Sequence, residues 1–276
     1  MFRLDHKVAI VTGAAQGLGA ATARTLAAQG AIVALADVNL EEVRRVATEC
    51  GPKSRAYRVD VSRVPELKDF AEAVVRDLGR IDILVNNAGI NPAPTSVIDL
   101  SNEYLDKLFA VNLKGPVRLA GLVAPVMAEQ AKGSVINVST VGAYAGGANF
   151  GAYTSAKAAL INFTKVMAKE WASMGIRVNA SIYSGTKGAI AMFTKSVARE
   201  VAADGILVNC IAPGVMDTEI MRNFPADRVQ AIREAIPLKR LGDPREVAAV
   251  IAFMASDECS YCTGATFDVN GGWLML

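Results

Sequence analysis

Short apolar runs along the chain alternate with longer segments in which apolar residues recur at helical spacing. Runs of this length are typical of strands buried on both faces, and their alternation with helices indicates a parallel sheet covered on both sides. The predicted strands are residues 7–11, 32–36, 56–59, 83–85, 134–138 and 265–269. The pattern therefore predicts an α/β fold built on a Rossmann-type, doubly wound parallel sheet. The longest helical segment, residues 102–131, contains Pro116 and Pro125, and we expect these prolines to bend it.

Composition bounds the number of domains and the kinds of partner. With 276 residues and 52% hydrophobic side chains, the chain can bury a large core, and we expect a single domain over residues 1–276. The net charge of +2 comes from interspersed signs, which gives no footprint for nucleic acid. The N-terminus lacks the apolar core of a signal peptide, and no apolar run reaches the length of a membrane span. We therefore expect a cytoplasmic protein that binds small molecules, with no nucleic-acid or membrane partner.

Cysteine and histidine are scarce, which excludes several kinds of chemistry. His6 is the only histidine, so the sequence excludes a Ser-His-Asp mechanism and a histidine-based metal site. Cys259 and Cys262 have the spacing of a zinc-ligand pair, but the sequence offers no second pair. We expect ordinary packing at these positions, no metal site, and no disulfide framework among the four cysteines.

A glycine-rich loop follows the first predicted strand directly and opens an alanine-rich helix. Its glycines are Gly13, Gly17 and Gly19, in the spacing Gly-x-x-x-Gly-x-Gly. Glycines let a backbone approach a pyrophosphate closely, and the amide groups at a helix N-terminus stabilise the negative charge. A purely structural tight turn is the alternative, but the strand, loop and helix in this order favour dinucleotide binding.

The second predicted strand ends at Asp37, eighteen residues after Gly19. An acidic residue there can accept hydrogen bonds from an adenosine ribose, whereas its charge repels a 2′-phosphate. A helix-capping role for Asp37 is the alternative, but Asn39 is better placed as the cap, with Glu42 completing a capping box. The sequence therefore favours NAD over NADP as the cofactor.

A Tyr-x-x-x-Lys pattern occurs twice, at Tyr153 and Lys157 and, thirty residues later, at Tyr183 and Lys187. Residues 153–179 and 183–209 share these residues and many others, which indicates an internal repeat of one helix–strand unit. Residues four apart lie on one face of a helix, so each lysine ammonium is placed near its tyrosine hydroxyl. A nearby cation lowers the pKa of a tyrosine, which can then take a proton from an alcohol or give one to a carbonyl oxygen.

Further motifs stand at expected strand ends or on expected helices: Asn86-Asn87-Ala88-Gly89, Asn112, Ser139 and Pro213-Gly214. With the glycine loop and Tyr153-x-x-x-Lys157, they make the sequence resemble the short-chain dehydrogenase/reductase family over nearly the whole chain. The resemblance implies one domain with about seven parallel strands. It also implies NAD(P)-dependent oxidation of alcohols or reduction of ketones.

The resemblance assigns roles to single residues. The implied catalytic residues are Asn112, Ser139, Tyr153 and Lys157, with Thr140 as a substitute for Ser139, and Tyr183 and Lys187 as less favoured alternates. The implied cofactor-binding residues are Gly13, Gln16, Gly17, Leu18, Gly19, Asp37, Asp60, Val61, Asn87, Ala88, Gly89, Tyr153, Lys157, Pro213, Gly214 and Thr218, with Asn86 lining the same strand end. Ser139 is implied to bind the substrate oxygen and Thr218 the carboxamide. Asn112 is implied to hold a water in a proton relay, and a buried asparagine that satisfies a helix bend at Pro116 is the alternative.

The repeat departs from the family pattern, in which one copy of the helix–strand unit is usual. Only one helix can place its tyrosine beside Ser139, so the two copies compete for one position. The second copy would need a connecting loop of over forty residues, which is uncommon in compact domains. We therefore expect Tyr153 and Lys157 to be the catalytic tyrosine and lysine. We also expect residues 206–211 to form strand six, and residues 175–204 to leave the sheet at the edge opposite the active site.

Three functions stay open. The leading hypothesis is an NAD-dependent dehydrogenase that interconverts a secondary alcohol and a ketone on a sugar, polyol, hydroxy acid or cyclic alcohol. The second is a 3-ketoacyl-thioester reductase, against which Asp37 counts because biosynthetic reduction generally uses NADPH. The third is a cofactor-binding protein inactivated by the insertion. By resemblance we also expect a homo-oligomer, a tetramer or dimer, paired through the long helix and the tyrosine-bearing helix.

Overall fold

One parallel sheet forms the centre of the computed structural model, which describes residues 3–90, 95–139, 149–181, 209–222, 224–263 and 265–273. The strands are β1 (Val8–Thr12), β2 (Ile32–Asp37), β3 (Arg55–Arg58), β4 (Ile83–Asn86), β5 (Gly133–Val138), β6 (Ile176–Ser181), β7 (Cys210–Pro213) and β8 (Thr266–Val269). Within the described residues the sheet has eight strands in the order β3-β2-β1-β4-β5-β6-β7-β8. Because the chain winds outward in both directions from β1 and β4, the predicted doubly wound fold is confirmed.

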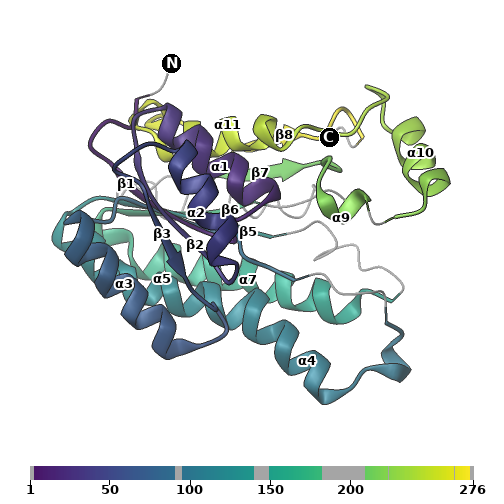
Figure 1. Ribbon diagram of the computed structural model, residues 1–276, viewed down its shortest axis with the longest axis horizontal. Helices are drawn as coiled ribbons and strands as arrows, with labels where there is room; N and C mark the ends of the chain where they lie inside the picture. Colours follow the sequence, from purple (N-terminus) through teal and green to yellow (C-terminus); the bar gives the residue numbers. More distant parts are fainter. Residues whose placement is uncertain are drawn as a thin grey trace.

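Helices cover both faces of the sheet (Figure 1). One face is covered by α1 (Gly17–Ala28), α2 (Leu40–Glu49) and α11 (Pro244–Ala255), and the other by α3 (Val64–Leu78), α5 (Gly115–Glu129) and α7 (Gly151–Glu170). The remaining elements are α4 (Asn102–Phe109), a π-helical turn (Ala110–Lys114), α9 (Glu219–Arg222), α10 (Ala226–Ala235) and short 3₁₀ turns at Val97–Asp99, Ala172–Met174 and Asp257–Cys259. No helix within the described ranges is both long enough and apolar enough to span a membrane.

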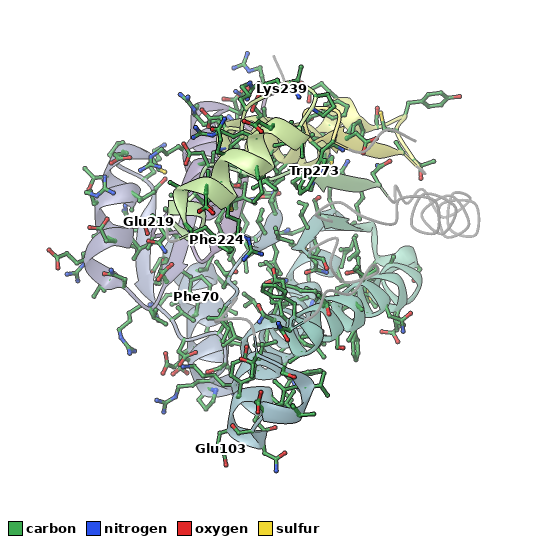
Figure 2. The ribbon with its side chains drawn as sticks, turned by 90° about the vertical axis from the view of Figure 1, so that its right-hand side faces the viewer. Phe70, Glu103, Glu219, Phe224, Lys239 and Trp273 are labelled. Carbon is green, nitrogen blue, oxygen red and sulfur yellow. The ribbon has the colours of Figure 1, made fainter. Side chains whose placement is uncertain are left out.

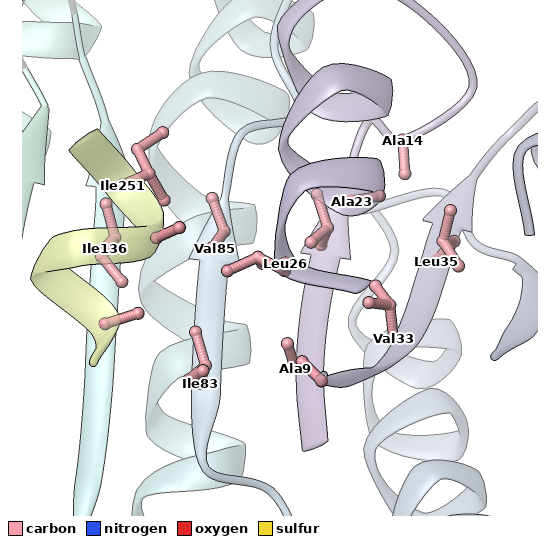
Figure 3. Packing of buried hydrophobic residues seen from close by; sticks show 14 of the residues in the cluster. Ala9, Ala14, Ala23, Leu26, Val33, Leu35, Ile83, Val85, Ile136 and Ile251 are labelled. Carbon is pink, nitrogen blue, oxygen red and sulfur yellow. The ribbon is translucent and has the colours of Figure 1, made fainter. Parts of the chain in front are cut away.

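The core between the sheet and α1 shows why the strand runs are continuously apolar. Ala23 and Leu26 of α1 lie over Ala9 and Val33 of β1 and β2 (Figure 3), and all four side chains are fully buried. The opposite face of the same strands is covered as well, so neither face needs polar residues. Apolar burial stabilises the fold by about 25 cal/mol per Å².

Residues 176–181 form a strand of the sheet, so the expectation that residues 175–204 leave the sheet is wrong for this described part. Gly175 leads directly into β6, which pairs with β5 from Gly133↔Ile176 to Val138↔Ser181. Ile176 and Val178 are fully buried in this position, and their burial favours keeping the segment in the sheet. The expected strand at residues 206–211 overlaps β7 at Cys210 and Ile211, and residues 206–208 lie outside the described ranges.

Two further corrections follow from the position of β6. β6 ends at Ser181, which pairs with Val138, so the chain leaves the sheet at its carboxyl edge and not at the opposite edge. The sheet has eight strands within the described residues, where about seven were expected. β6 and β7 pair through Ala180↔Cys210 and Ser181↔Ile211, each separated by the thirty residues that relate the two copies.

The long helix is irregular before its first proline. The chain runs from α4 into the π-helical turn Ala110–Lys114 and then into α5, whose first turn contains Pro116. A proline in the first turn lacks only an N–H that has no helical partner there, so it starts α5 without breaking it. The expected irregularity is therefore present, but it is a π-turn, a feature frequent at functional sites.

Candidate active site

The parallel strands β1, β4, β5 and β7 all end at the carboxyl edge of the sheet. Figure 2 views the side of the molecule that carries α9 and α10, where Glu219 marks α9, Phe224 precedes α10, and Glu103 marks α4 at the lower end. In open α/β sheets ligands bind at this edge, at the point where the strand order reverses. The reversal here lies between β1 and β4.

The glycine loop after β1 requires its glycines. Gly13 has φ +64° and Gly17 has φ +54°, in the left-handed region that other residues rarely adopt. A Cβ on Gly13 would come within 2.8 Å of the Ala88 Cα, and one on Gly19 would come within 2.0 Å of the Gly13 carbonyl oxygen. The loop therefore packs directly on the backbone that follows β4.

The N-terminus of α1 presents amide groups at the end of this loop. The helix begins at Gly17, and among the described residues its first turn has no acidic side chain and its N-cap residue Gln16 makes no side-chain capping bond. Leu18 packs partly into the core below. The first amides of a helix have no partners inside the helix, and together with the helix dipole they suit an anion such as a pyrophosphate.

Asp37 ends β2 beside the glycine loop. Its Oδ2 accepts a hydrogen bond from Ala15 N at 3.1 Å, and its Oδ1 accepts one from Asn39 N at 3.0 Å. The predicted Asn39 cap is confirmed, because its side chain accepts from Glu42 N at the start of α2. The predicted capping box is wrong, because Asn39 N donates to Asp37 and the Glu42 carboxylate accepts from Arg45 instead. Arg58 of β3 pairs in register with Asp37, and the sequence did not predict that this arginine lies beside Asp37.

The end of β3 leads to Asp60 and Val61. Burial opposes ionisation of Asp60, but hydrogen bonds from the backbone and hydroxyl of Ser62 hold the pKa of its carboxyl below the usual value. Val61 is buried, and a Cβ on Gly115 would come within 2.5 Å of its carbonyl oxygen. The segment is therefore fixed against the start of α5.

The Asn87-Ala88-Gly89 segment is tied to β1 by Thr12, a residue outside the predicted site. The Thr12 hydroxyl oxygen accepts hydrogen bonds from Asn87 N at 3.1 Å and Ala88 N at 3.0 Å. In return, Asn87 Nδ2 donates to the carbonyls of Thr12 and Gly13. The only sign of this role in the sequence is that Thr12 is a polar residue at the end of the apolar run of β1.

Asn112 is fully buried in the π-helical turn. Its Nδ2 donates to Ile90 O at 2.8 Å, and its Oδ1 accepts from Ile90 N at 3.1 Å. A Cβ on Gly89 would come within 2.8 Å of Asn112 Oδ1 and 3.5 Å of Lys157 Nζ. The Asn112 amide thus holds the loop after β4 close to the lysine and does not satisfy a bend at Pro116.

Ser139 and Lys157 meet between β5 and α7. Ser139 Oγ donates to the Lys157 carbonyl oxygen at 3.0 Å, and Lys157 Nζ donates to the Val138 carbonyl oxygen at 2.9 Å. The lysine side chain is only 3% exposed, and this burial lowers its pKa to about 8. Tyr153 lies one turn earlier on the same face of α7 and packs beside Leu108 of α4.

The loop after β7 returns to the glycine loop. Pro213 ends β7, and Gly214 N donates to Val269 O at 2.8 Å. A Cβ on Gly17 would lie 3.8 Å from Thr218 Cγ2, so Thr218 stands across the edge from the start of α1. The cofactor residues expected on β1, β2, β4 and β7 therefore lie around one edge.

Some expected residues cannot be placed. Tyr183, Lys187 and Thr140 lie outside the described residues. Within the described ranges, no group of three or more histidine, cysteine or acidic side chains is arranged to hold a metal ion. The Cys259 thiol is buried, and burial together with a hydrogen bond to Cys262 raises its pKa to about 11.

Comparison with known families gives two matches that together span nearly the whole chain. The profile of the short chain dehydrogenase family matches residues 7–182, and that of an enoyl-(acyl carrier protein) reductase family matches residues 180–274. The boundary between the matches falls at the end of β6.

Whole-length relatives agree with this assignment. The chain is 36% identical over 276 residues to the 3-oxoacyl-[acyl-carrier-protein] reductase FabG of Thermotoga maritima, covering 99% of this chain and 100% of that protein. It is 34% identical over 272 residues to the meso-2,3-butanediol dehydrogenase of Serratia marcescens, covering 98% and 95%.

Among solved structures, a putative short-chain alcohol dehydrogenase from Sinorhizobium meliloti 1021 superposes with a TM-score of 0.82 at 29% identity, covering 99% of this chain and 98% of that one. The structure of gox2181 superposes with a TM-score of 0.81, also at 29% identity, covering 98% and 96%. The family profile, the relatives and the fold all lead to one assignment. This chain belongs to the short-chain dehydrogenase family and is an oxidoreductase.

Proposed function

We propose that the chain is an NAD-dependent oxidoreductase that interconverts a secondary alcohol and a ketone on a small hydroxylated substrate, such as a sugar, polyol, hydroxy acid or cyclic alcohol. The observation that carries this proposal is the position of Lys157, buried beside Ser139 and Gly89 at the edge that also holds the glycine loop. A buried lysine is unfavourable for folding, and such groups cluster at functional sites.

The residues at this edge fit a dinucleotide. The open side of Gly17 and the amides at the start of α1 suit a pyrophosphate. When bound, the nicotinamide would accept a hydride from the alcohol or return one to the ketone. Family members typically use such a cofactor, and the preference for NAD is supported by the Asp37 carboxylate, which lies against the loop and would repel a 2′-phosphate.

The proton is assigned to Tyr153. In alcohol oxidation the tyrosine takes the hydroxyl proton as general base, and in ketone reduction it returns the proton. The Lys157 ammonium on the same helix face favours the phenolate, and Ser139 holds the substrate oxygen. Asn112 fixes the loop after β4 through Ile90, which keeps Gly89 beside the lysine.

The first copy of the repeat is assigned the catalytic role. The internal repeat over residues 153–179 and 183–209 rests on the sequence identities between the copies, and the thirty-residue offset of the β6–β7 pairs supports it. α7 of the first copy carries Lys157 against Val138, directly before Ser139. Tyr183 and Lys187 are assigned to the added unit.

A 3-ketoacyl-thioester reductase is the second candidate, favoured by the similarity to the Thermotoga maritima reductase. Asp37 counts against it, because biosynthetic reduction generally draws on NADPH. The two candidates therefore differ in both the cofactor and the substrate.

A homo-oligomer, a tetramer or dimer, is part of the proposal. Phe163 and Val166 of α7 are 43% and 41% exposed, and they line an apolar groove with Val117 and Leu122 of α5. Apolar side chains gathered on two neighbouring helices suit pairing with a second copy. Light scattering at micromolar concentration tests this, and a monomer would reject it.

One assay separates the candidate functions. Purified protein is mixed with NAD or NADP and a panel of sugars, polyols, hydroxy acids and cyclic alcohols, and with NADH or NADPH and a 3-ketoacyl thioester, while the reduced cofactor is followed by absorbance. Oxidation of one or more alcohols with NAD supports the proposal. Turnover of the thioester alone, with NADPH, selects the reductase, and saturable NADH binding without any turnover selects a cofactor-binding protein.

A further inference from the structure

A chain of side-chain hydrogen bonds crosses the sheet beneath the candidate site. Asn86 Nδ2 at the end of β4 donates to Asn137 Oδ1 on β5 at 2.8 Å, and Asn137 Nδ2 donates to Thr164 Oγ1 on α7 at 3.0 Å. Thr164 Oγ1 then donates to the Leu160 carbonyl oxygen at 2.8 Å. We call Asn86, Asn137 and Thr164 the Asn–Asn–Thr chain.

The hydrogen bonds of the chain run in one direction only. The single hydroxyl proton of Thr164 is given to Leu160, so the Thr164 oxygen must accept from Asn137. Asn86 Nδ2 donates both to Asn137 and to the carbonyl of Pro116 at 3.2 Å, which fixes the oxygen of the Asn137 amide toward β4. A flipped Asn137 amide would place two donors against each other. The chain therefore has one arrangement.

The three side chains are buried where an unmatched partner is costly. Asn86 is 2% exposed, Asn137 is fully buried, and Thr164 is 4% exposed. A buried polar group that loses its partner suffers the full desolvation penalty, whereas a satisfied network fixes the elements that it joins. The chain thus ties β4, β5, α5 and α7 into one position.

The chain acts next to the proposed catalytic residues. Ser139 directly follows β5, two residues after Asn137, so the two side chains fall on the same face by the period of the strand. Lys157 and Thr164 are seven residues apart on α7, about two turns, so they share one face of the helix. Ser139 bonds the backbone of Lys157, and Asn137 bonds Thr164. Two attachment points about 10 Å apart along the helix fix both its position and its direction.

We propose that Asn86, Asn137 and Thr164 are positioning residues, which hold α7 on β5 so that Tyr153 and Lys157 meet the substrate beside Ser139. The inference rests on the proposed function, because it gives α7 its catalytic role. A displacement of reacting groups by about 1 Å can lower turnover by about 10²-fold. Asn137 and Thr164 are outside the cofactor residues, so substitutions at these two positions should affect kcat more than cofactor affinity.

The test compares Thr164→Val with Thr164→Ser and with the control Thr154→Val. Valine removes the acceptor of Asn137, and serine keeps it. Thr154 is a matched control because it is also a buried threonine of α7, and its hydroxyl donates only to the carbonyls of Phe150 and Gly151 in its own helix. Active sites are counted by NADH titration, and kcat is given per NADH-binding site.

We expect Thr164→Val to lower kcat roughly 10- to 100-fold while the NADH Kd changes less than about threefold. Thr164→Ser should return kcat to within about threefold of the unmodified protein, and Thr154→Val should leave it unchanged. A purely structural role would lower the number of binding sites but leave kcat per site intact, and that result would overturn the proposal.

A second readout separates this inference from the proposed function. If the unmodified protein turns over no substrate, the proposed function fails, and amide hydrogen exchange over α7 then decides the positioning claim. Faster exchange in Thr164→Val than in Thr164→Ser supports attachment of α7 through the chain. Equal exchange in the two variants overturns it.

Discussion

The hydroxyl of Ser139 donates a hydrogen bond to the backbone carbonyl of Lys157, with 3.0 Å between Oγ and O. This bond joins the strand that ends at the candidate site to the helix that carries the lysine. A hydroxyl has one proton and rotates to suit its partners. To bind a substrate oxygen as proposed, Ser139 turns that proton away from the helix, so its docking role and its catalytic role compete.

Ser139→Ala is expected to lower kcat/KM by about 10²- to 10³-fold, because the substrate oxygen loses a placed donor. The lost bond to the Lys157 carbonyl should also reduce the free energy of unfolding by about 1 kcal/mol. Ser139→Thr, which keeps a hydroxyl, serves as the control. Steady-state kinetics and urea unfolding measure both effects. Near-normal turnover in Ser139→Ala, with loss of turnover in Thr140→Ala, would move the role to Thr140.

Asp37→Ser is expected to narrow the preference for NAD over NADP by roughly 10- to 100-fold, since the negative charge that opposes a 2′-phosphate is removed. Calorimetry with each cofactor gives the two Kd values. Asp69→Ser, on an exposed turn of α3, is the control and should leave the preference unchanged. Equal affinity of the unmodified protein for the two cofactors contradicts the assignment of Asp37.

Lys157→Met is expected to remove activity and to raise stability at neutral pH. Burial lowers the Lys157 pKa to about 8 in the folded protein, so below that pH the fold carries a desolvated charge that methionine lacks. From about pH 8 to the ordinary lysine pKa of 10.5 the unfolded chain binds more protons than the folded one, and the stability of the unmodified protein rises with pH. The advantage of the variant should therefore be greatest below pH 8 and shrink above it.

Urea unfolding of both proteins between pH 6 and 10 checks this prediction, with turnover measured in parallel. Lys107→Met, at an exposed position of α4, is the control and should show no such pH dependence. A Lys157→Met variant that is less stable than the unmodified protein at pH 7 would show that the ammonium is stabilised in the fold.

The sequence predicts the sheet well where burial is continuous. The six strands predicted outside the repeat are present within one or two residues. Four of them, β1, β2, β4 and β5, are nearly continuously buried, and strands buried on both faces need unbroken apolar runs. The glycine loop follows from steric need, since a Cβ on Gly13 or Gly19 has no room. Local rules also place the Asn39 cap correctly.

Features that depend on tertiary contacts are not predicted. β6 stays in the sheet because its pairing with β5 buries Ile176 and Val178 completely, and the sequence alone does not show this pairing. Asn137 and Thr164 stand in apolar segments and find each other only when α7 packs on β5. Arg58 lies beside Asp37 through strand pairing, which no local pattern shows.

The central claim is that the first copy of the repeat does the chemistry, and turnover of Tyr153→Phe and Tyr183→Phe with NAD tests it most directly. Each variant loses one hydroxyl and keeps the ring, so packing is nearly unchanged. Loss of the general base should lower kcat by about 10²- to 10⁴-fold. The proposal predicts that Tyr153→Phe is inactive and that Tyr183→Phe keeps turnover within about threefold of the unmodified protein. An inactive Tyr183→Phe beside an active Tyr153→Phe would contradict the assignment.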